Sequence, residues 1–145
     1  MPQIALAGRG GSRPRGCDFG CGPNPVLRDL VRARGVDCDA YDPLFPQGEP
    51  RPPYDFILAS EVFEHFREPA EEMARICSWL LPGGMLGVMT ERWCSRAQFT
   101  DWPYTTDPTH IAFLHDRTWR WIEERFALER LVDDGRRVTL HRRVR

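Results

Sequence analysis

The segment from Asp18 to Pro25, which reads DFGCGPNP, constrains the fold of this chain more than any other feature. It follows a short apolar run near Cys17 and precedes a stretch with helical spacing, so it joins a strand to a helix. Glycines at such a junction let a ligand approach the backbone, and the N–H groups at a helix N-terminus can receive an anion. The segment therefore predicts a ligand-binding turn in an α/β domain.

The rest of the chain alternates between strand and helix patterns. We expect strands at 17–19, 36–41, 54–59 and 85–90, helices starting near 25, 69 and 116, and a final hairpin of 127–132 and 137–142. Asn24 and Asp116 are the expected helix N-caps, and Pro82-Gly83-Gly84 is expected to end the second helix. This order predicts an α/β doubly wound, mostly parallel sheet with a C-terminal antiparallel hairpin.

Composition indicates one soluble domain. The 145 residues suit a poorly ordered lead-in at 1–15 and a single domain at 16–145, with 41% hydrophobic and 28% charged residues and no apolar run of the roughly 20 residues that a membrane span needs. Every basic side chain is arginine, which is typical of a GC-rich, bacterial-type genome, so arginine content alone is weak evidence for nucleic acid. The five cysteines form no C-x-x-C pair and follow no secretory signal, which favours reduced thiols and a cytoplasmic location.

The chemistry of the glycine turn argues against a dinucleotide. Pro25 stands where the third glycine of G-x-G-x-x-G is needed, and Asp18 would put a carboxylate beside a pyrophosphate. The ligand should therefore carry positive charge and no phosphate. S-adenosyl-L-methionine meets both conditions, because its amino group and sulfonium are compatible with a nearby acid and its carboxylate can use the helix N-terminus. Asp42, after the second strand, lies where an acid accepts both ribose hydroxyls.

Four segments carry a resemblance to a known family, and they stand in that family's order between Gly16 and Thr90: CDFGCGPNPVL, AYDP, YDFILASEVFEHF and LLPGGMLGVMT. Together they resemble the class I S-adenosylmethionine-dependent methyltransferases, of the group that includes ubiquinone-biosynthesis O-methyltransferases. The resemblance implies a Rossmann-like fold, methyl transfer as the activity, and these cofactor-binding residues: Asp18, Gly20, Cys21, Gly22, Asp42, Ser60 and Glu61.

Three features depart from that family's pattern. Asn24 replaces the third glycine of the family's loop. Only eleven residues separate Asp42 from Tyr54, too few for the usual helix and third strand that help to hold adenine. The N-terminal helix that normally covers the cofactor is not evident, so we expect a compact or truncated variant.

A second group of residues suggests a metal or a base. If the chain after the strand at 54–59 turns helically, Glu61, Glu64 and His65 share one face. In the alternative, purely structural interpretation, Glu64 and His65 pair with each other or with backbone. The pattern is similar to that by which ubiquinone O-methyltransferases and RNA 3′-terminal 2′-O-methyltransferases are thought to hold a divalent metal, with His110 as the downstream histidine. Without metal, His65 or His110 could act as the catalytic general base.

Three functions remain open from the sequence. The leading one is methyl transfer to a small-molecule oxygen, with nitrogen and carbon acceptors not excluded. The second is RNA 2′-O-methylation, which needs a basic face beside the pocket; five arginines near the C-terminus could form it or could simply protect a strand edge: Arg136, Arg137, Arg142, Arg143 and Arg145. The third is a non-catalytic domain that kept the fold.

The segment after the strand at 85–90 is rich in aromatic residues. Trp93, Trp102, Pro103 and Tyr104 could form a lid over the substrate or could simply pack under a loop. We assign no role to His115 or His141, because a lone histidine more often caps or faces solvent. We expect a small-molecule partner rather than nucleic acid and no membrane partner, and the sequence does not give the oligomeric state.

Overall fold

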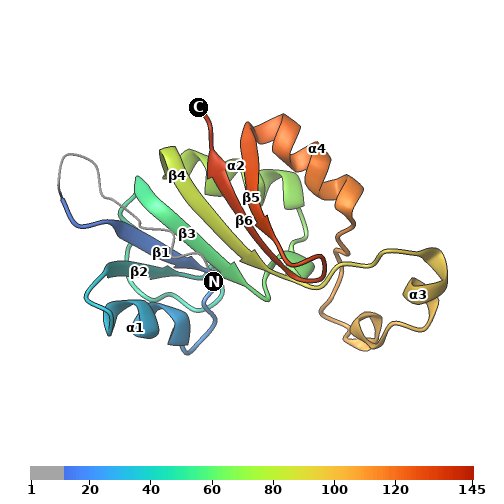
Figure 1. Cartoon of the computed structure of the whole chain (residues 1–145). Coiled ribbons are helices and arrows are strands. Elements are labelled where there is room, and N and C mark those ends of the chain that lie inside the picture. Colours follow the sequence, from blue (N-terminus) through green and yellow to red (C-terminus); the bar gives the residue numbers. More distant parts are fainter. Residues whose placement is uncertain (1–11) are drawn as a thin grey trace.

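A computed structural model describes residues 12–145, so most of the predicted lead-in, residues 1–11, lies outside the described residues. Six strands form one sheet (Figure 1). In chain order the elements are β1 (Arg15–Phe19), α1 (Val26–Arg32), β2 (Asp37–Tyr41), β3 (Tyr54–Ser60), the 3-10 turn η2 (Phe63–His65), α2 (Pro69–Trp79), β4 (Leu80–Met89), α3 (Arg96–Thr100), η3 (Pro103–Thr106), α4 (Asp116–Phe126), β5 (Leu128–Asp133) and β6 (Val138–Arg143). Within the described part of the chain, no helix combines the length and apolarity needed to cross a bilayer.

The strand order is β2-β1-β3-β4-β6-β5. The first four strands in this order run parallel, while β6 is antiparallel to β4 and β5 is antiparallel to β6. The predicted α/β sheet with a C-terminal hairpin is therefore confirmed. The chain steps from β1 outward to β2 and then crosses back to β3, so the strand order reverses between β1 and β3, the point at which ligands of such sheets bind.

On the β2 side, the sheet lacks the third strand that is usual in the family that the sequence resembles. Residues 42–53 form neither strand nor helix, so β2 is an edge strand, as the eleven-residue spacing predicts. The missing third strand is the part of the fold that the resemblance assigned to adenine binding.

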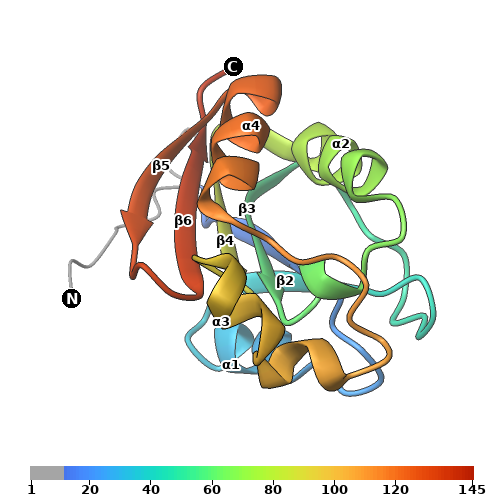
Figure 2. The ribbon, with the colours of Figure 1, turned by 90° about the vertical axis from the view of Figure 1, so that its right-hand side faces the viewer.

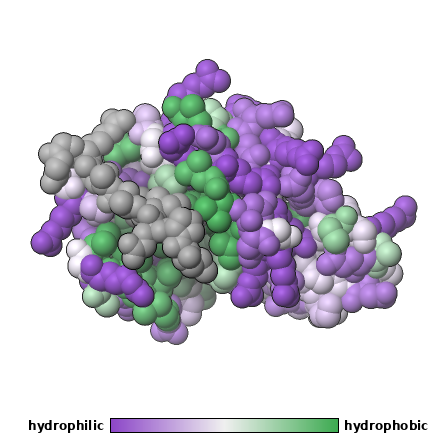
Figure 3. Space-filling model, in the orientation of Figure 1, coloured by the Kyte–Doolittle hydropathy of each residue, from purple (hydrophilic) through white to green (hydrophobic). Residues whose placement is uncertain are grey.

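The main core lies between the sheet and two helices. Figure 2 shows α2 and α4 side by side on one face of the sheet. Met73 and Ile76 of α2 and Trp119 and Ile122 of α4 are buried there against the apolar run of β3. The opposite face carries a smaller buried cluster of Cys38, Phe56 and Met85, and Val31 of α1 packs against it. Figure 3 shows further apolar side chains on the surface, around its middle.

Two of the predicted helix N-caps are wrong. The N-cap of α1 is Pro25, whose side chain has no acceptor for a capping hydrogen bond, and the Asn24 carbonyl accepts from the Val26 amide at 2.8 Å. The N-cap of α4 is His115, whose Nδ1 accepts from the Arg117 amide at 3.1 Å. His115, to which we assigned no role, is thus a helix cap.

The end of α2 also differs from the prediction. The helix ends at Trp79 and the chain enters β4 at Leu80, so Pro82-Gly83-Gly84 lies inside a strand. Tyr54 pairs with Leu80 but Phe56 with Met85, which marks a register shift at this point. Proline and glycine are compatible with such a bulge, because the extra residues make no regular ladder bonds.

Candidate active site

The glycine turn lies at the carboxyl ends of β1 and β2. The amides of Gly20 and Cys21 both donate to the Tyr41 carbonyl at the end of β2, at 2.8 and 3.2 Å. Gly20 and Gly22 have φ values of 76° and 64°, in the left-handed region that favours glycine. A Cβ at Gly20 would come within 2.1 Å of Val62, so this glycine is required by close packing. A Cβ at Gly22 would meet nothing within 4 Å, so the space beside the Gly22 Cα is free for a ligand.

Asp42 is tied to this turn. Its Oδ2 accepts from the Gly22 amide at 2.9 Å, and its Oδ1 accepts from the amides of Leu44 and Phe45 at 2.8 and 3.1 Å. A carboxylate offers about four acceptor positions, so most of this capacity is already used by backbone. The predicted contact with two ribose hydroxyls would compete with these bonds, and the role stays a prediction.

Asp18 and Cys21 have local roles as well. Asp18 is buried and its Oδ2 accepts from the Arg28 amide at 3.0 Å, which fastens the start of α1 to β1. Burial raises the pKa of Asp18 above its usual value. Cys21 is half-buried, and burial raises the pKa of its thiol to about 11, so it is neutral at neutral pH.

The chain leaves β3 at Ser60 without forming the expected helix. Glu61 has a φ of 52°, and its amide donates to the Met89 carbonyl at 2.7 Å. Only the short turn η2 follows. The predicted shared helical face of Glu61, Glu64 and His65 is therefore wrong, because Glu61 lies in a left-handed conformation outside any helix.

Glu64, His65 and His110 nevertheless converge. One ligand atom from each lies within 4.8 Å of the others, and Glu64 is fully buried while His65 is exposed and His110 is half-buried. Two amides of the returning segment, at Ile111 and Ala112, donate to the Glu64 carbonyl at 2.8 and 3.0 Å and bring His110 to this place. The metal-site prediction requires His110 to lie close to Glu64, and in the folded chain it does.

The two imidazoles are held by backbone carbonyls. His65 Nδ1 lies 2.9 Å from the Thr109 carbonyl, and His110 Nδ1 lies 2.7 Å from the Tyr104 carbonyl. Because a carbonyl only accepts, each neutral ring carries its hydrogen on Nδ1 and leaves Nε2 as a lone-pair donor. This is the arrangement in which histidines ligate metals.

Tyr104 and Thr90 complete the surroundings of Glu64. The Tyr104 hydroxyl donates to Glu64 Oε1 and lies 3.2 Å from Glu61 Oε2, and the Thr90 hydroxyl donates to Glu64 Oε2 at 3.0 Å. Partial burial and the neighbouring Glu64 raise the pKa of Glu61. Within residues 12–145, Glu61 is not part of the convergent metal-ligating group, so its predicted ligand role is not supported by the geometry.

Sequence reasoning missed Thr90 and gave Tyr104 only a lid role. A polar residue directly after the buried strand β4 was the available signal for Thr90, since such residues lie at the ligand-binding edge of the sheet. Trp102 is buried and stacks on Tyr104 with ring centroids 4.8 Å apart. Trp102 therefore packs under the loop, whereas Tyr104 reaches the carboxylates.

Comparisons with known proteins agree with this geometry. A family model described as a methyltransferase domain matches residues 3–131. A comparison with curated protein sequences gives no match.

Solved structures of methyltransferases share the fold. A proposed sarcosine dimethylglycine methyltransferase from Galdieria sulphuraria is 14% identical with a TM-score of 0.68, over 90% of this chain and 78% of that one. An O-methyltransferase family protein from Burkholderia thailandensis is 12% identical with a TM-score of 0.69, over 97% of this chain and 53% of that one. A proposed methyltransferase from Bacillus halodurans is 12% identical with a TM-score of 0.63, over 90% of this chain and 93% of that one. The chain belongs to the methyltransferase domain family.

Proposed function

We propose that this domain transfers a methyl group from S-adenosylmethionine to a hydroxyl oxygen of a small molecule, with a divalent metal held by Glu64, His65 and His110. The convergence of these three side chains beside the crevice carries the proposal. Glu61 borders the cofactor on the other side of Glu64 in this proposal.

The donor set fits a divalent cation. A fully buried carboxylate is costly unless a positive charge compensates it, and no arginine of the described residues forms an ion pair with Glu64. Ligand bonds of roughly 2.1 Å need donor atoms about 3–3.5 Å apart, so the three donors would contract modestly on binding. One carboxylate and two neutral imidazoles favour Mn²⁺, Fe²⁺ or Zn²⁺ over Mg²⁺. Solvent exposure of His65 leaves room for an acceptor oxygen.

The residues of the crevice fit the cofactor. The free space beside Gly22 and the carboxylate of Asp42 lie beyond the carboxyl ends of β1 and β2, next to the switch point of the strand order. When bound there, the cofactor supplies an electrophilic methyl group on its sulfonium. With β2 as an edge strand, we propose that adenine is held by fewer contacts than in relatives with a full sheet.

The reaction forms two bonds and breaks two, because the proton that leaves the acceptor oxygen bonds to a base. The acceptor oxygen bonds to the methyl carbon, the carbon–sulfur bond breaks to leave S-adenosylhomocysteine, and the acceptor loses its proton. A metal in the site would lower the pKa of the acceptor hydroxyl. Glu61, whose pKa is raised by partial burial and by the neighbouring Glu64, is our candidate for the proton acceptor when both imidazoles bind metal. Without metal, Nε2 of His110 would take the proton, and the Asp107 carboxylate 3.7 Å away would pair with the resulting imidazolium.

A small-molecule acceptor is favoured over RNA by the state of the C-terminal arginines. Arg136 pairs with Glu91, Arg142 pairs with Glu129, and Arg143 donates to the carbonyls of Cys77 and Leu80. Arg136 and Arg142 are thus already paired with carboxylates, which reduces the charge that these two side chains offer to a phosphate backbone.

The experiment is transfer of a labelled methyl group from S-adenosylmethionine to a panel of catechols, phenols and matched amines, with Mn²⁺ or with a chelator. We expect labelled ethers that require Mn²⁺ and are lost in Glu64→Gln but retained in Glu71→Gln, an exposed control on α2. Labelled amines without labelled ethers would contradict the oxygen acceptor. Failure to bind S-adenosylhomocysteine by calorimetry would support a non-catalytic domain.

A further inference from the structure

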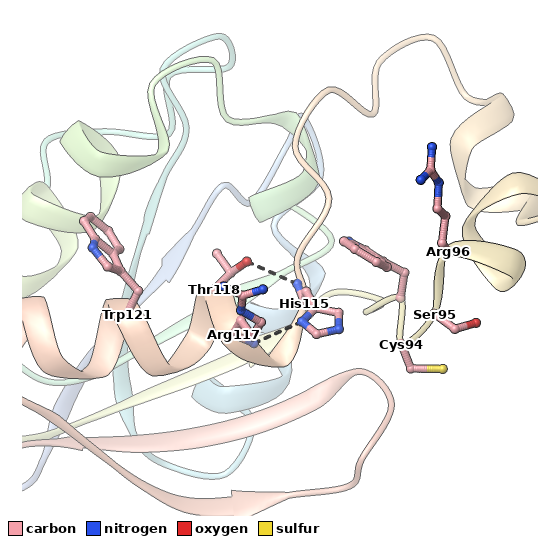
Figure 4. Close-up of a pocket in the computed structure, with 8 residues that line it drawn as sticks. Cys94, Ser95, Arg96, His115, Arg117, Thr118 and Trp121 are labelled. Atoms are coloured by element: carbon pink, nitrogen blue, oxygen red, sulfur yellow. Dashed lines mark hydrogen bonds between the residues drawn. The ribbon is translucent and has the colours of Figure 1, made fainter.

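The segment 91–115 links β4 to α4, and we call it the 91–115 excursion. A hollow lies outside the candidate active site, between the start of this excursion and α4. It is wide open to solvent, has a volume of about 640 Å³ and is lined by Trp93, Cys94, Ser95, Arg96, His115, Arg117, Thr118 and Trp121. Figure 4 shows Cys94, Ser95 and Arg96 on one side and His115, Arg117, Thr118 and Trp121 on the other. We call this hollow the outer groove.

The two walls of the outer groove are fixed to each other at their base. The Trp93 amide donates to the Leu114 carbonyl at 3.1 Å, and Arg92 and Leu114 form a parallel bridge. The Trp93 ring packs against the His115 ring, with centroids 4.5 Å apart. The groove is therefore largely formed before any ligand arrives, which lowers the entropic cost of binding.

The lining of the groove carries unneutralised positive charge. Its residues include Arg96 and Arg117 but no aspartate or glutamate. Neither guanidinium forms an ion pair with a carboxylate anywhere in residues 12–145. By contrast, Arg120 and Arg130 nearby both pair with Asp116, at 2.8 and 2.7 Å. Asp116, which lies between His115 and Arg117 in the chain, is thus already engaged with other arginines, and the groove attracts an anion.

Aromatic faces flank this charge. Trp121 is 53% exposed, an unusual fraction for the largest apolar side chain. Trp93 is half-buried and is held on its other side by Phe99, with centroids 5.4 Å apart. Two indoles and an imidazole beside two guanidiniums offer stacking and charge together, which suits a ring that carries an anionic group. The volume fits a one- or two-ring molecule.

The groove is separate from the candidate active site but belongs to the same excursion. None of its residues is shared with the glycine turn or with Glu64, His65 and His110. Ring contacts run from Trp93 through Phe99, Trp102 and Tyr104 to His110. We propose that the outer groove is a second binding site, for a small planar anion: an aromatic ring bearing a carboxylate or a phosphate. This inference does not depend on the proposed methyl acceptor.

Calorimetric titration of the whole chain with four probes tests the proposal: 1-naphthyl phosphate, 1-naphthoate, 1-naphthol and inorganic phosphate. We expect at least one of the two naphthyl anions to bind at least about tenfold more tightly than 1-naphthol and inorganic phosphate, because both stacking and charge are needed. Comparison of the two anions distinguishes a phosphate from a carboxylate ligand. Binding should weaken as salt is raised.

Variants locate the probe. Arg96→Gln and Arg117→Gln should each weaken binding of the naphthyl anion by about threefold to tenfold, and Trp121→Leu should do the same by removing a stacking face. Arg125→Gln, an exposed arginine of α4 outside the groove, should leave binding unchanged. All four positions have exposed side chains, so thermal unfolding midpoints should stay near that of the wild type.

Four results would overturn the proposal. They are binding of 1-naphthol as tight as that of the better naphthyl anion, unchanged binding in the Arg96→Gln/Arg117→Gln double variant, loss of probe binding when S-adenosylhomocysteine is added, and binding of a single-stranded ten-nucleotide RNA more than about a hundredfold tighter than the probe. The third would place the probe in the cofactor crevice, and the fourth would assign the groove to nucleic acid.

Discussion

The hydroxyl of Tyr104 donates a hydrogen bond to the buried carboxylate of Glu64, forty residues earlier in the chain. This bond closes the 91–115 excursion over the end of β3 and gives the carboxylate a second donor beside Thr90. Tyr104 also contacts His110, with ring centroids 4.2 Å apart. The contacts that hold the excursion in place therefore also position the candidate metal ligands.

Removing the Tyr104 hydroxyl should weaken the attachment of the 91–115 excursion and the positioning of the candidate metal ligands. Tyr104→Phe leaves a buried carboxylate with one donor fewer and should lower the free energy of unfolding by about 1–3 kcal/mol. Urea denaturation measures the loss. Tyr41→Phe is the matched control, since its hydroxyl accepts from the partly exposed Arg75, and it should cost less than about 1 kcal/mol. Equal losses in the two variants would contradict a special role for Tyr104.

Metal binding should depend on Glu64, on His110 and on pH. Glu64→Gln and His110→Ala should each reduce Mn²⁺ or Zn²⁺ affinity by at least about tenfold while S-adenosylhomocysteine still binds, because the ligands lie on the acceptor side. Affinity should fall as the solution is acidified from about pH 8 to about pH 5.5, because a protonated imidazole cannot ligate. Calorimetry at several pH values checks both. Tight metal binding by Glu64→Gln would refute the site.

The glycine turn can be tested with a pair of matched glycines. Gly22 and Gly35 both have positive φ, and an added Cβ meets nothing within 4 Å at either. Gly22→Val and Gly35→Val should each lower stability by at least about 1–2 kcal/mol through backbone strain. Only Gly22→Val should also weaken S-adenosylhomocysteine binding, by at least about tenfold, because its side chain would occupy the ligand's approach. Normal binding by Gly22→Val would mean that the cofactor turn is misplaced.

Asp42 should affect the cofactor through the turn as well as directly. Asp42→Ala removes the acceptor of three backbone amides and any ribose contact, so cofactor binding should weaken by about 1–3 kcal/mol. Asp42→Asn keeps one acceptor oxygen and should lose less. Calorimetry with S-adenosylhomocysteine orders the variants, and equal affinity in wild type and Asp42→Ala would remove Asp42 from the site.

Acid should destabilise the fold through His141. This imidazole is fully buried against Trp119, and burial lowers its pKa below 6.5, opposed by a hydrogen bond with Glu123 at 3.0 Å. The unfolded chain therefore binds a proton more readily than the native one, so stability falls as the pH drops through the histidine's unfolded pKa toward its lower native pKa. Urea denaturation at about pH 7.5 and about pH 5.5 measures the slope.

The control for this prediction is His141→Leu. It removes the titrating group, so its stability should change less between the two pH values than that of the wild type. A slope as steep in the variant would assign the acid sensitivity to carboxylates instead.

Much of the fold could be predicted from local pattern. The apolar run at 54–59 and the hairpin around Asp133-Asp134-Gly135 became β3 and the β5–β6 pair, because strand propensity and turn chemistry act over a few residues. The helix ends were less predictable. Pro82-Gly83-Gly84 reads equally well as a helix stop or as a strand bulge, and only its pairing opposite β3 decided for the bulge.

The sequence by itself determined the family, the glycine turn and the identity of Glu64 and His65 as neighbours, since these depend on residue type and short spacing. It also determined that β2 would be a sheet edge, because eleven residues cannot supply another helix and strand. Only the tertiary structure decided which side chains meet. The left-handed turn at Glu61 separated this residue from the ligand group, and the fold of 91–115 brought Tyr104 and His110 to Glu64. Tertiary packing also made His115 a helix cap and buried the imidazole of His141. Such contacts link residues that are tens of positions apart in the chain. Local sequence carries little information about them, because they form only when the loops and the core pack as a whole.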